Sequence, residues 1–196
     1  VPAAWKGKRV FVVVGAADHD TEFFIDGTPL GKHIGGYTPF EYEITDFIRW
    51  GEPQNVEFKV WDPNDHEARE GHYLYGKQGY GNARGIWQTV YLEARGETYA
   101  DSVRFIPDIK SGSVTANVIM PAPVTKDVKA SIEVDGQKCD FTVSKGAIAA
   151  TAVIKLNNPR LWELDDPYLY DAKVTVGDDS VKSYFGFREF GVAMND

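Results

Sequence analysis

Apolar and polar residues alternate along most of this chain, and that period of two constrains its fold more than any other feature of the sequence. In the stretch QNVEFKVWD, Val56, Phe58 and Val60 would share one face of a strand, and Trp61 would lie on the other. The same alternation recurs in DSVRF, SVTANVI, VKASIEV, AIAATAVIKL and DAKVTV. Helical periodicity is nearly absent. The sequence therefore predicts an all-β protein whose strands are buried on one side.

Three turn signals join neighbouring strands into predicted hairpins. Asp26-Gly27 and Asp135-Gly136 each separate two alternating runs, and Asp-Gly supplies the positive φ angles that a tight turn requires. Gly177-Asp178-Asp179 predicts a third hairpin. Only residues 45–50 favour a single helical turn, which Thr45 would cap.

The spacing of the strands predicts two domains. From Tyr99 onward, seven candidate strands begin near residues 101, 113, 128, 138, 147, 170 and 180, which is the number in a constant-type immunoglobulin-like sandwich. The first half has longer connections and more aromatic residues, as jelly rolls do. We therefore expect a jelly-roll-like β-sandwich over residues 1–97, incomplete at its N-terminus, and an immunoglobulin-like β-sandwich over residues 98–196.

Composition excludes some partners and leaves the compartment open. The formal net charge is −8, the pI is near 5.0 and no Lys/Arg cluster occurs, so we expect no nucleic-acid partner. No apolar run approaches the length of a membrane span. The single cysteine, Cys139, alternates with Phe141 and Val143, which predicts a buried and inert thiol. Because the chain begins at Val1 with no signal sequence, periplasmic, secreted and cytoplasmic locations all stay open.

One connection is unusually long. More than twenty residues between Trp61 and Ile86 show no strand or helix pattern, and a loop of that length in a compact domain is usually functional or disordered. Its three tyrosines, Tyr73, Tyr75 and Tyr80, favour some order, because disordered linkers are poor in aromatic residues.

Several phrases, in order along nearly the whole chain, resemble glycoside hydrolase family 2, which includes β-galactosidases, β-glucuronidases and β-mannosidases. The most specific is Gly85-Ile86-Trp87-Gln88-Thr89-Val90-Tyr91-Leu92-Glu93, preceded by Gly76-Lys77-Gln78. The other matching phrases are Trp5-Lys6-Gly7-Lys8-Arg9-Val10, Asp26-Gly27 through Leu30-Gly31, HIGGYTPF at residues 33–40, Ile44-Thr45-Asp46, Trp162, Pro167-Tyr168-Leu169-Tyr170 and Phe185-Gly186-Phe187-Arg188.

The resemblance implies a sugar-binding jelly roll followed by an immunoglobulin-like domain, both non-catalytic. In family 2 enzymes a TIM barrel follows and carries the catalytic carboxyls, one of them in an Asn-Glu pair. No Asn-Glu dipeptide occurs here, and no residues remain for a barrel, which needs about 250. We therefore expect this chain to be inactive alone and to need no cofactor. Its partners would be the barrel and, through the parent enzyme, a carbohydrate; homo-oligomerisation of the parent stays open.

The resemblance also points to candidate substrate-binding residues. In family enzymes the loop corresponding to residues 62–85 reaches toward the mouth of the barrel, and Lys77, Gln78 and Tyr80 lie on it. The acidic residue that several members carry in this loop is absent here, because Gln78 or Gly79 stands at its place. Gln78 offers a donor and an acceptor to sugar hydroxyls. Holding the loop against a neighbouring domain is an equally good role for Lys77 and Gln78.

Aromatic and histidine side chains offer further candidates. Trp61, Trp87 and Tyr91 alternate onto the face opposite the apolar set, where a sugar could stack, but we expect burial against another domain. We expect His19 at a loop tip and His33 in surface hydrogen bonding, within a corner rather than a catalytic loop. His66 and His72 share a loop with Asp62, Asp65, Glu67 and Glu70 that lacks the spacing of a calcium loop, so we expect a solvated acidic loop and no metal.

Overall fold

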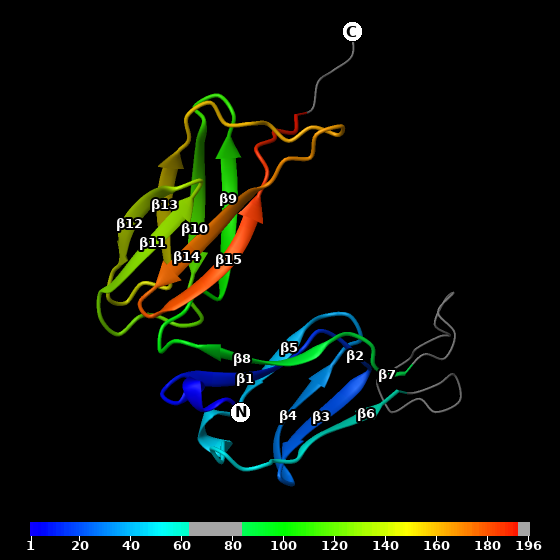
Figure 1. Cartoon of the computed structure of the whole chain (residues 1–196). Coiled ribbons are helices and arrows are strands. Elements are labelled where there is room, and N and C mark those ends of the chain that lie inside the picture. The colour runs from blue at the N-terminus through cyan, green and yellow to red at the C-terminus, as the bar shows by residue number, and fades with distance from the viewer. Residues whose placement is uncertain (63–83, 192–196) are drawn as a thin grey trace. The chain divides into compact units, whose positions relative to one another are not determined.

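The computed structural model describes residues 1–62 and 84–191, and the chain divides into two compact units, Val1–Arg95 and Gly96–Asp196. Both are built almost entirely of antiparallel strands, which confirms the predicted all-β class (Figure 1). In the described ranges, no helix is long and apolar enough to cross a membrane.

The first unit pairs two three-stranded sheets with a short ribbon. Its elements are the 3₁₀ turn η1 (Ala3–Trp5), β1 (Arg9–Val14), β2 (Ala17–Asp18), β3 (Asp20–Ile25), β4 (Thr28–Ile34), β5 (Phe40–Glu43), the 3₁₀ turn η2 (Thr45–Phe47), β6 (Val56–Trp61), β7 (Gly85–Ile86) and β8 (Val90–Arg95). One sheet has the order β5-β1-β8, the other β4-β3-β6, and β2 pairs with β7. Its buried core comprises Val10, Val12, Phe23, Ile25 and Ile44.

The outer face of the β5-β1-β8 sheet is covered by charged side chains rather than left apolar. Phe11 is buried although it points away from the core, because the guanidinium carbons of Arg9 and Arg95 lie 5.3 and 4.3 Å from its ring centroid. Each arginine forms a two-pronged ion pair with β5, Arg9 with Glu43 and Arg95 with Glu41. These stacked and bidentate contacts bury Phe11 on the outer face, while Val10 and Val12 are buried in the core on the other face.

The second unit is a sandwich of three strands on four (Figure 1). Its strands are β9 (Ser102–Asp108), β10 (Ser113–Ile119), β11 (Val128–Val134), β12 (Gln137–Val143), β13 (Ala149–Lys155), β14 (Tyr170–Val176) and β15 (Asp179–Phe185). The sheets have the orders β13-β10-β9 and β12-β11-β14-β15. Alternate residues of β10, β11 and β14 fill the core, as the period of two predicts.

The number of strands matches a constant-type sandwich, but the sheet membership differs from the constant-type arrangement. In that arrangement the fourth strand joins the sheet of the first, second and fifth strands. Here the fourth strand, β12, pairs with β11 along its whole length. The reason is the Asp135-Gly136 turn, whose φ angles of 49° and 71° fold the chain straight back and keep both strands in one sheet.

The other predicted turns form with one correction. Asp26-Gly27, with φ angles of 47° and 79°, joins β3 to β4, and Gly177 with φ 62° begins the turn from β14 to β15. Thr45 does not cap the helical turn as predicted, because it lies inside η2. Its hydroxyl instead accepts a hydrogen bond from the Val10 amide at 3.0 Å and donates to Glu43 Oε1 at 2.8 Å.

Partial burial corrects two smaller predictions. Cys139 on β12 packs against the core of the second unit but is only half-buried. Val56 is exposed while Phe58 packs on the core, and β6 is an edge strand of its sheet.

Candidate functional site

The three sequence-predicted sugar contacts, Lys77, Gln78 and Tyr80, lie outside the described residues, as do His66 and His72. Their roles therefore stay predictions. What the structure does describe is the pair of residues at the ends of that loop, Asp62 after β6 and Arg84 before β7.

The ends of the loop are held in place by charge and by strand pairing. Asp62 is buried, and its Oδ2 lies 3.9 Å from the Nε atom of Arg84. Strand β7 begins at Gly85, directly after Arg84, and pairs with β2, where Ile86 lies opposite Ala17. Asp62 and Arg84, the described residues on either side of 63–83, therefore lie on a fixed part of the first unit.

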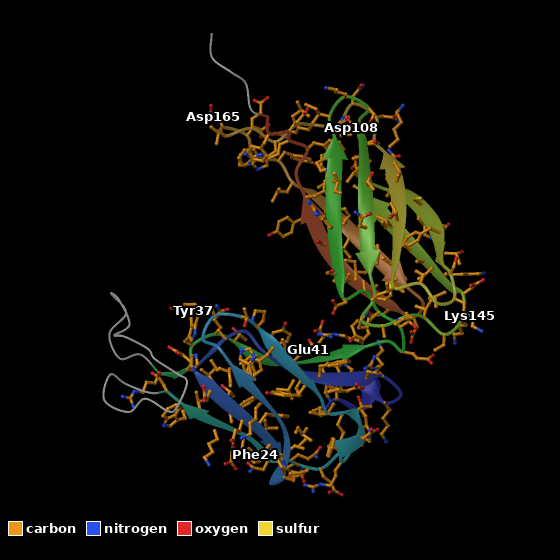
Figure 2. All side chains as sticks on the ribbon, turned by 180° about the vertical axis from the view of Figure 1, so that it is seen from behind. Phe24, Tyr37, Glu41, Asp108, Lys145 and Asp165 are labelled. Carbon is orange, nitrogen blue, oxygen red and sulfur yellow. The ribbon has the colours of Figure 1, made fainter. Side chains whose placement is uncertain are left out.

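Next to these loop ends, the exposed rings of Tyr37 and Trp87 lie in contact and form a group that we term the aromatic edge. Trp87 is 53% exposed and Tyr37 is 73% exposed. Figure 2 labels Tyr37 on the connection between β4 and β5. Because large apolar side chains seldom gather at a surface without a partner, the aromatic edge is the candidate site of this unit.

The indole of Trp87 is fixed in orientation. Its Nε1 donates to the carbonyl oxygen of Gly36 at 2.8 Å, and the Tyr37 ring meets it edge-on, with centroids 6.2 Å apart and planes at 75°. Its backbone amide donates to Ala16 O at 3.2 Å. A ring held by two contacts, on a backbone that is itself bonded, loses little conformational freedom when a ligand binds.

The two glycines of HIGGYTPF make this contact possible. Gly35 has φ 133°, a conformation that favours glycine, and its amide donates to His19 O at 3.1 Å. A Cβ on Gly36 would lie 3.0 Å from the Asp18 Oδ1 atom. The stretch is a corner between β4 and β5, and its close backbone approach presents the Gly36 carbonyl to Trp87.

Both described histidines differ from their predictions. His19 does not lie at a loop tip: it stands between β2 and β3, largely buried, with Nδ1 2.7 Å from Asp20 Oδ1. His33 does not serve surface hydrogen bonding. Its ring stacks on Phe40 at 4.1 Å because both side chains leave the corner on the same side.

Aromatic stacking and hydrogen bonding are the chemistry that the aromatic edge can offer. Among residues 1–62 and 84–191, no three His, Cys, Asp or Glu side chains come together as a metal site would require. The lowered carboxyl pKa values have structural causes: the Asn55 amide bonds Asp26 in a turn, Arg9 bonds Glu43, and the Ser111 hydroxyl bonds Asp108. Flat aromatic faces suit the C–H face of a sugar ring or another apolar protein surface.

The fold and the aromatic edge define a class of protein: two antiparallel β-sandwich units, the first presenting fixed aromatic side chains beside the ends of a long loop. Sequence similarity narrows the class. Residues 98–188 match the model of "Glycosyl hydrolases family 2". The resemblance to glycoside hydrolase family 2 that the motifs indicate is thereby confirmed, in the part of the chain that forms the immunoglobulin-like sandwich.

Similarity to individual proteins extends over nearly the whole chain. A β-galactosidase of Thermoanaerobacter pseudethanolicus is 27% identical over 96% of this chain and 26% of its own length. A β-glucuronidase of Bacteroides fragilis is 28% identical over 95% of this chain and 30% of its own length. The chain therefore spans less than a third of these two relatives.

A solved structure shares the fold. A glycosyl hydrolase family 2 member from Bacteroides cellulosilyticus superposes with a TM-score of 0.73 at 20% identity, over 96% of this chain and 26% of the other. The aligned region again corresponds to about a quarter of the longer protein.

Sequence reasoning found the loop and its flanking motif but missed the contact that organises them. Trp87 and Gly36 are 51 residues apart, and nothing in the alternation pattern predicts that an indole between β7 and β8 bonds a carbonyl between β4 and β5. The only signal was indirect: two adjacent glycines permit a close backbone approach.

Proposed function

We propose that this chain is the non-catalytic N-terminal region of a family 2 β-glycosidase, an enzyme that hydrolyses O-glycosyl bonds. The observation that carries the proposal is the alignment with a β-galactosidase over 96% of this chain but only 26% of that relative. The remaining length of such relatives would hold the catalytic machinery.

In this proposal the two domains, residues 1–97 and 98–196, brace a catalytic TIM barrel and shape one wall of its sugar pocket. Retaining hydrolysis needs two carboxyls about 5 to 5.5 Å apart, and a barrel would supply both. The chain described here would contribute a rigid wall, because the loop ends are fixed by the Asp62–Arg84 pair and by the β2–β7 ribbon.

Substrate contact would come from the loop. Lys77, Gln78 and Tyr80 would lie at the mouth of the barrel, where Gln78 can both donate to and accept from sugar hydroxyls. A contact made equally in the ground state and the transition state changes KM and leaves kcat alone.

The test uses the longer polypeptide encoded by the same reading frame, assayed on β-galactosides and β-glucuronides. Gln78→Ala should raise KM about tenfold with little change in kcat, since one uncharged hydrogen bond to substrate is worth roughly 0.5–1.5 kcal/mol. Gln54→Ala is the matched control, because Gln54 bonds Phe47 and Asp26 within the first unit. Equal kinetics of Gln78→Ala and the parent enzyme would remove Gln78 from the pocket.

A second candidate function is a stand-alone carbohydrate-binding module. The exposed and fixed Trp87 ring favours it, because stacking on a preset aromatic face is a way to hold a sugar without catalysis. A structural sandwich pair that orients other domains is the remaining alternative. Titration of the 196-residue chain with galactose and glucuronic acid separates them. Quenching of tryptophan fluorescence with millimolar or tighter affinity, lost in Trp87→Ala, supports the module, and no change supports the other roles.

A further inference from the structure

A second exposed apolar group lies on the other unit, at the end of the sandwich where the chain between β13 and β14 extends away from the sheets (Figure 1). We term it the Trp162 patch, and it comprises the exposed Leu161, Leu164, Arg188 and Phe190 and the half-buried Trp162. The fully buried Phe187 and the side chains of Ile109, Glu163 and Glu189 line the same groove. Leu164 is 86% exposed and Phe190 is 77% exposed. These residues line a shallow groove of about 350 Å³.

The patch is held rigidly although it stands away from the sheets. The Glu163 and Asp166 amides each donate to the other's carbonyl oxygen, at 3.1 and 3.2 Å, which closes a tight turn with Leu164 at its tip. Figure 2 shows Asp165 at the outer end of this turn. The Trp162 amide donates to Phe187 O at 2.8 Å and ties the turn to the chain that follows β15.

Two further contacts brace the base of the turn. The Arg160 guanidinium forms a two-pronged ion pair with the Asp166 carboxylate and lies 4.6 Å from the Tyr168 ring centroid. Gly186 leaves room for the indole, because a Cβ there would lie 3.1 to 3.3 Å from Trp162 side-chain atoms. The exposed side chains are therefore presented in one arrangement, which lowers the entropy lost when a partner docks.

Arg188 gives the patch a polar centre. Its guanidinium carbon lies 4.1 Å from the centroid of the Trp162 ring and 3.8 Å from that of Phe190, so the cation packs against both rings. A guanidinium carries five N–H donors and no acceptor, so Arg188 can bond carboxylate or carbonyl oxygens of a partner.

We propose that the Trp162 patch is the docking surface for the domain that follows this chain in the same polypeptide. The inference rests on the proposed function. A patch of apolar side chains around one arginine fits a protein surface with apolar residues around a carboxylate or carbonyl oxygen. A buried aromatic and arginine centre is also the composition that dominates the energy of interfaces.

Proximity along the chain selects this occupant over a separate protein. The patch is built from residues 161–190, and the described part of the chain runs only to Gly191, so a domain that follows would be tethered beside it. A short tether gives an effective concentration in the millimolar range, at which a modest interface is occupied. The relatives carry more than two thirds of their length outside the aligned region.

The experiment compares the 196-residue chain with the longer polypeptide of the same reading frame by hydroxyl-radical footprinting. We expect oxidation of Leu164 and Phe190 to be roughly tenfold slower in the longer polypeptide, because the fully desolvated centre of an interface excludes water. Ile148, which is exposed on the same unit outside the patch, is the internal control and should keep its rate.

Variants complete the test. Leu164→Ser and Phe190→Ser should leave the melting temperature of the 196-residue chain unchanged but restore fast oxidation of the remaining patch residues in the longer polypeptide. Ile148→Ser should change neither the melting temperature nor the oxidation of the patch. Unchanged oxidation in a longer polypeptide that hydrolyses glycosides would overturn the docking inference alone. A longer polypeptide without hydrolytic activity would overturn the proposed function. Slow oxidation in the 196-residue chain that depends on its concentration would assign the patch to a second copy and reject the inference.

Discussion

Trp87 donates its indole N–H to the carbonyl oxygen of Gly36 across 2.8 Å, and this bond joins two of the motifs that resemble family 2. One partner belongs to Gly85-Ile86-Trp87 and the other to the HIGGYTPF corner. The bond fixes an aromatic ring that stays half in solvent, so the motifs act together in presenting a surface rather than in filling a core.

Replacing Trp87 tests this interpretation. Because its ring is 53% exposed, Trp87→Ala should cost about 1 kcal/mol of unfolding free energy, within the usual range for a single substitution. Phe23→Ala, at a fully buried ring of the same unit, should cost about 3 to 5 kcal/mol. Urea denaturation followed by circular dichroism measures both. Equal losses would show that Trp87 is buried in solution.

The exposure of Trp87 in the structure also shows which features the alternation of apolar and polar residues can predict. Val114, Ala116 and Val118 are buried together, as are the alternate residues of β11 and β14, because a two-sheet sandwich gives each strand one inner face. The same pattern placed Trp61, Trp87 and Tyr91 on an outer face but could not say what covers it. In this chain Trp87 and Tyr91 are exposed and Trp61 is half-buried, and their burial against another domain stays a prediction.

Gly31 marks a close approach that a side chain would block. A Cβ there would overlap the Tyr42 ring, which stacks on Phe23 with centroids 4.8 Å apart. Gly31→Ala should therefore cost about 1 to 3 kcal/mol, the usual cost of overpacking. Gly191→Ala is the control, because nothing lies within 4 Å of its Cβ direction.

A double-mutant cycle separates this clash from a general effect of alanine in a strand. If the clash is the cause, Gly31→Ala combined with Tyr42→Leu should cost clearly less than the sum of the two single changes. Additive losses of unfolding free energy in the double variant would reject the clash with Tyr42 as the cause.

Tyr170 supports the turn that carries the Trp162 patch. It is buried at the start of β14, and its hydroxyl accepts a hydrogen bond from the Arg160 amide at 2.6 Å, an arrangement similar to the tyrosine corner of immunoglobulin-like domains. Tyr170→Phe leaves that amide unsatisfied and should cost about 1 to 2 kcal/mol in thermal unfolding. Tyr184→Phe, on an exposed ring, should cost nothing measurable. Equal melting temperatures for the two variants would contradict this role.

Glu43 should make stability depend on pH. Its hydrogen bond from Arg9 holds its pKa below the ordinary value of 4.5, with a smaller contribution from Thr45. Because the folded pKa lies below the unfolded one, the stabilisation is fully present above about pH 4.5 and is lost as the pH falls through the folded pKa. Glu43→Gln should thus be less stable than wild type at pH 7, by at most about 1 kcal/mol, and equal to it at low pH.

The matched control for that experiment is Glu57→Gln, at an exposed residue of β6. Urea midpoints of all three proteins at pH 7, 4.5 and 3 provide the comparison. A gap between wild type and Glu43→Gln that stays constant across this range would show that the Glu43 carboxylate contributes no proton-linked stability.

Local patterns predicted the strands, whereas contacts between residues further apart in the sequence determined the side-chain packing. All seven strands of the second unit begin within two residues of their predicted starts, because Asp135-Gly136 and Gly177 fix where the chain must turn. The hydrogen bond from Trp87 to Gly36 and the stacking of His33 on Phe40 depend on tertiary geometry. Propensity and period carry no information about such contacts.

Hydrolysis of chromogenic β-galactosides and β-glucuronides by the 196-residue chain, beside the longer polypeptide of the same reading frame, tests the central claim most directly. Our account predicts that the chain alone releases no chromophore above the buffer rate and that the longer polypeptide turns over at least one of the two substrates. Turnover by the 196-residue chain unaided, or a reading frame that stops at Asp196, would contradict it.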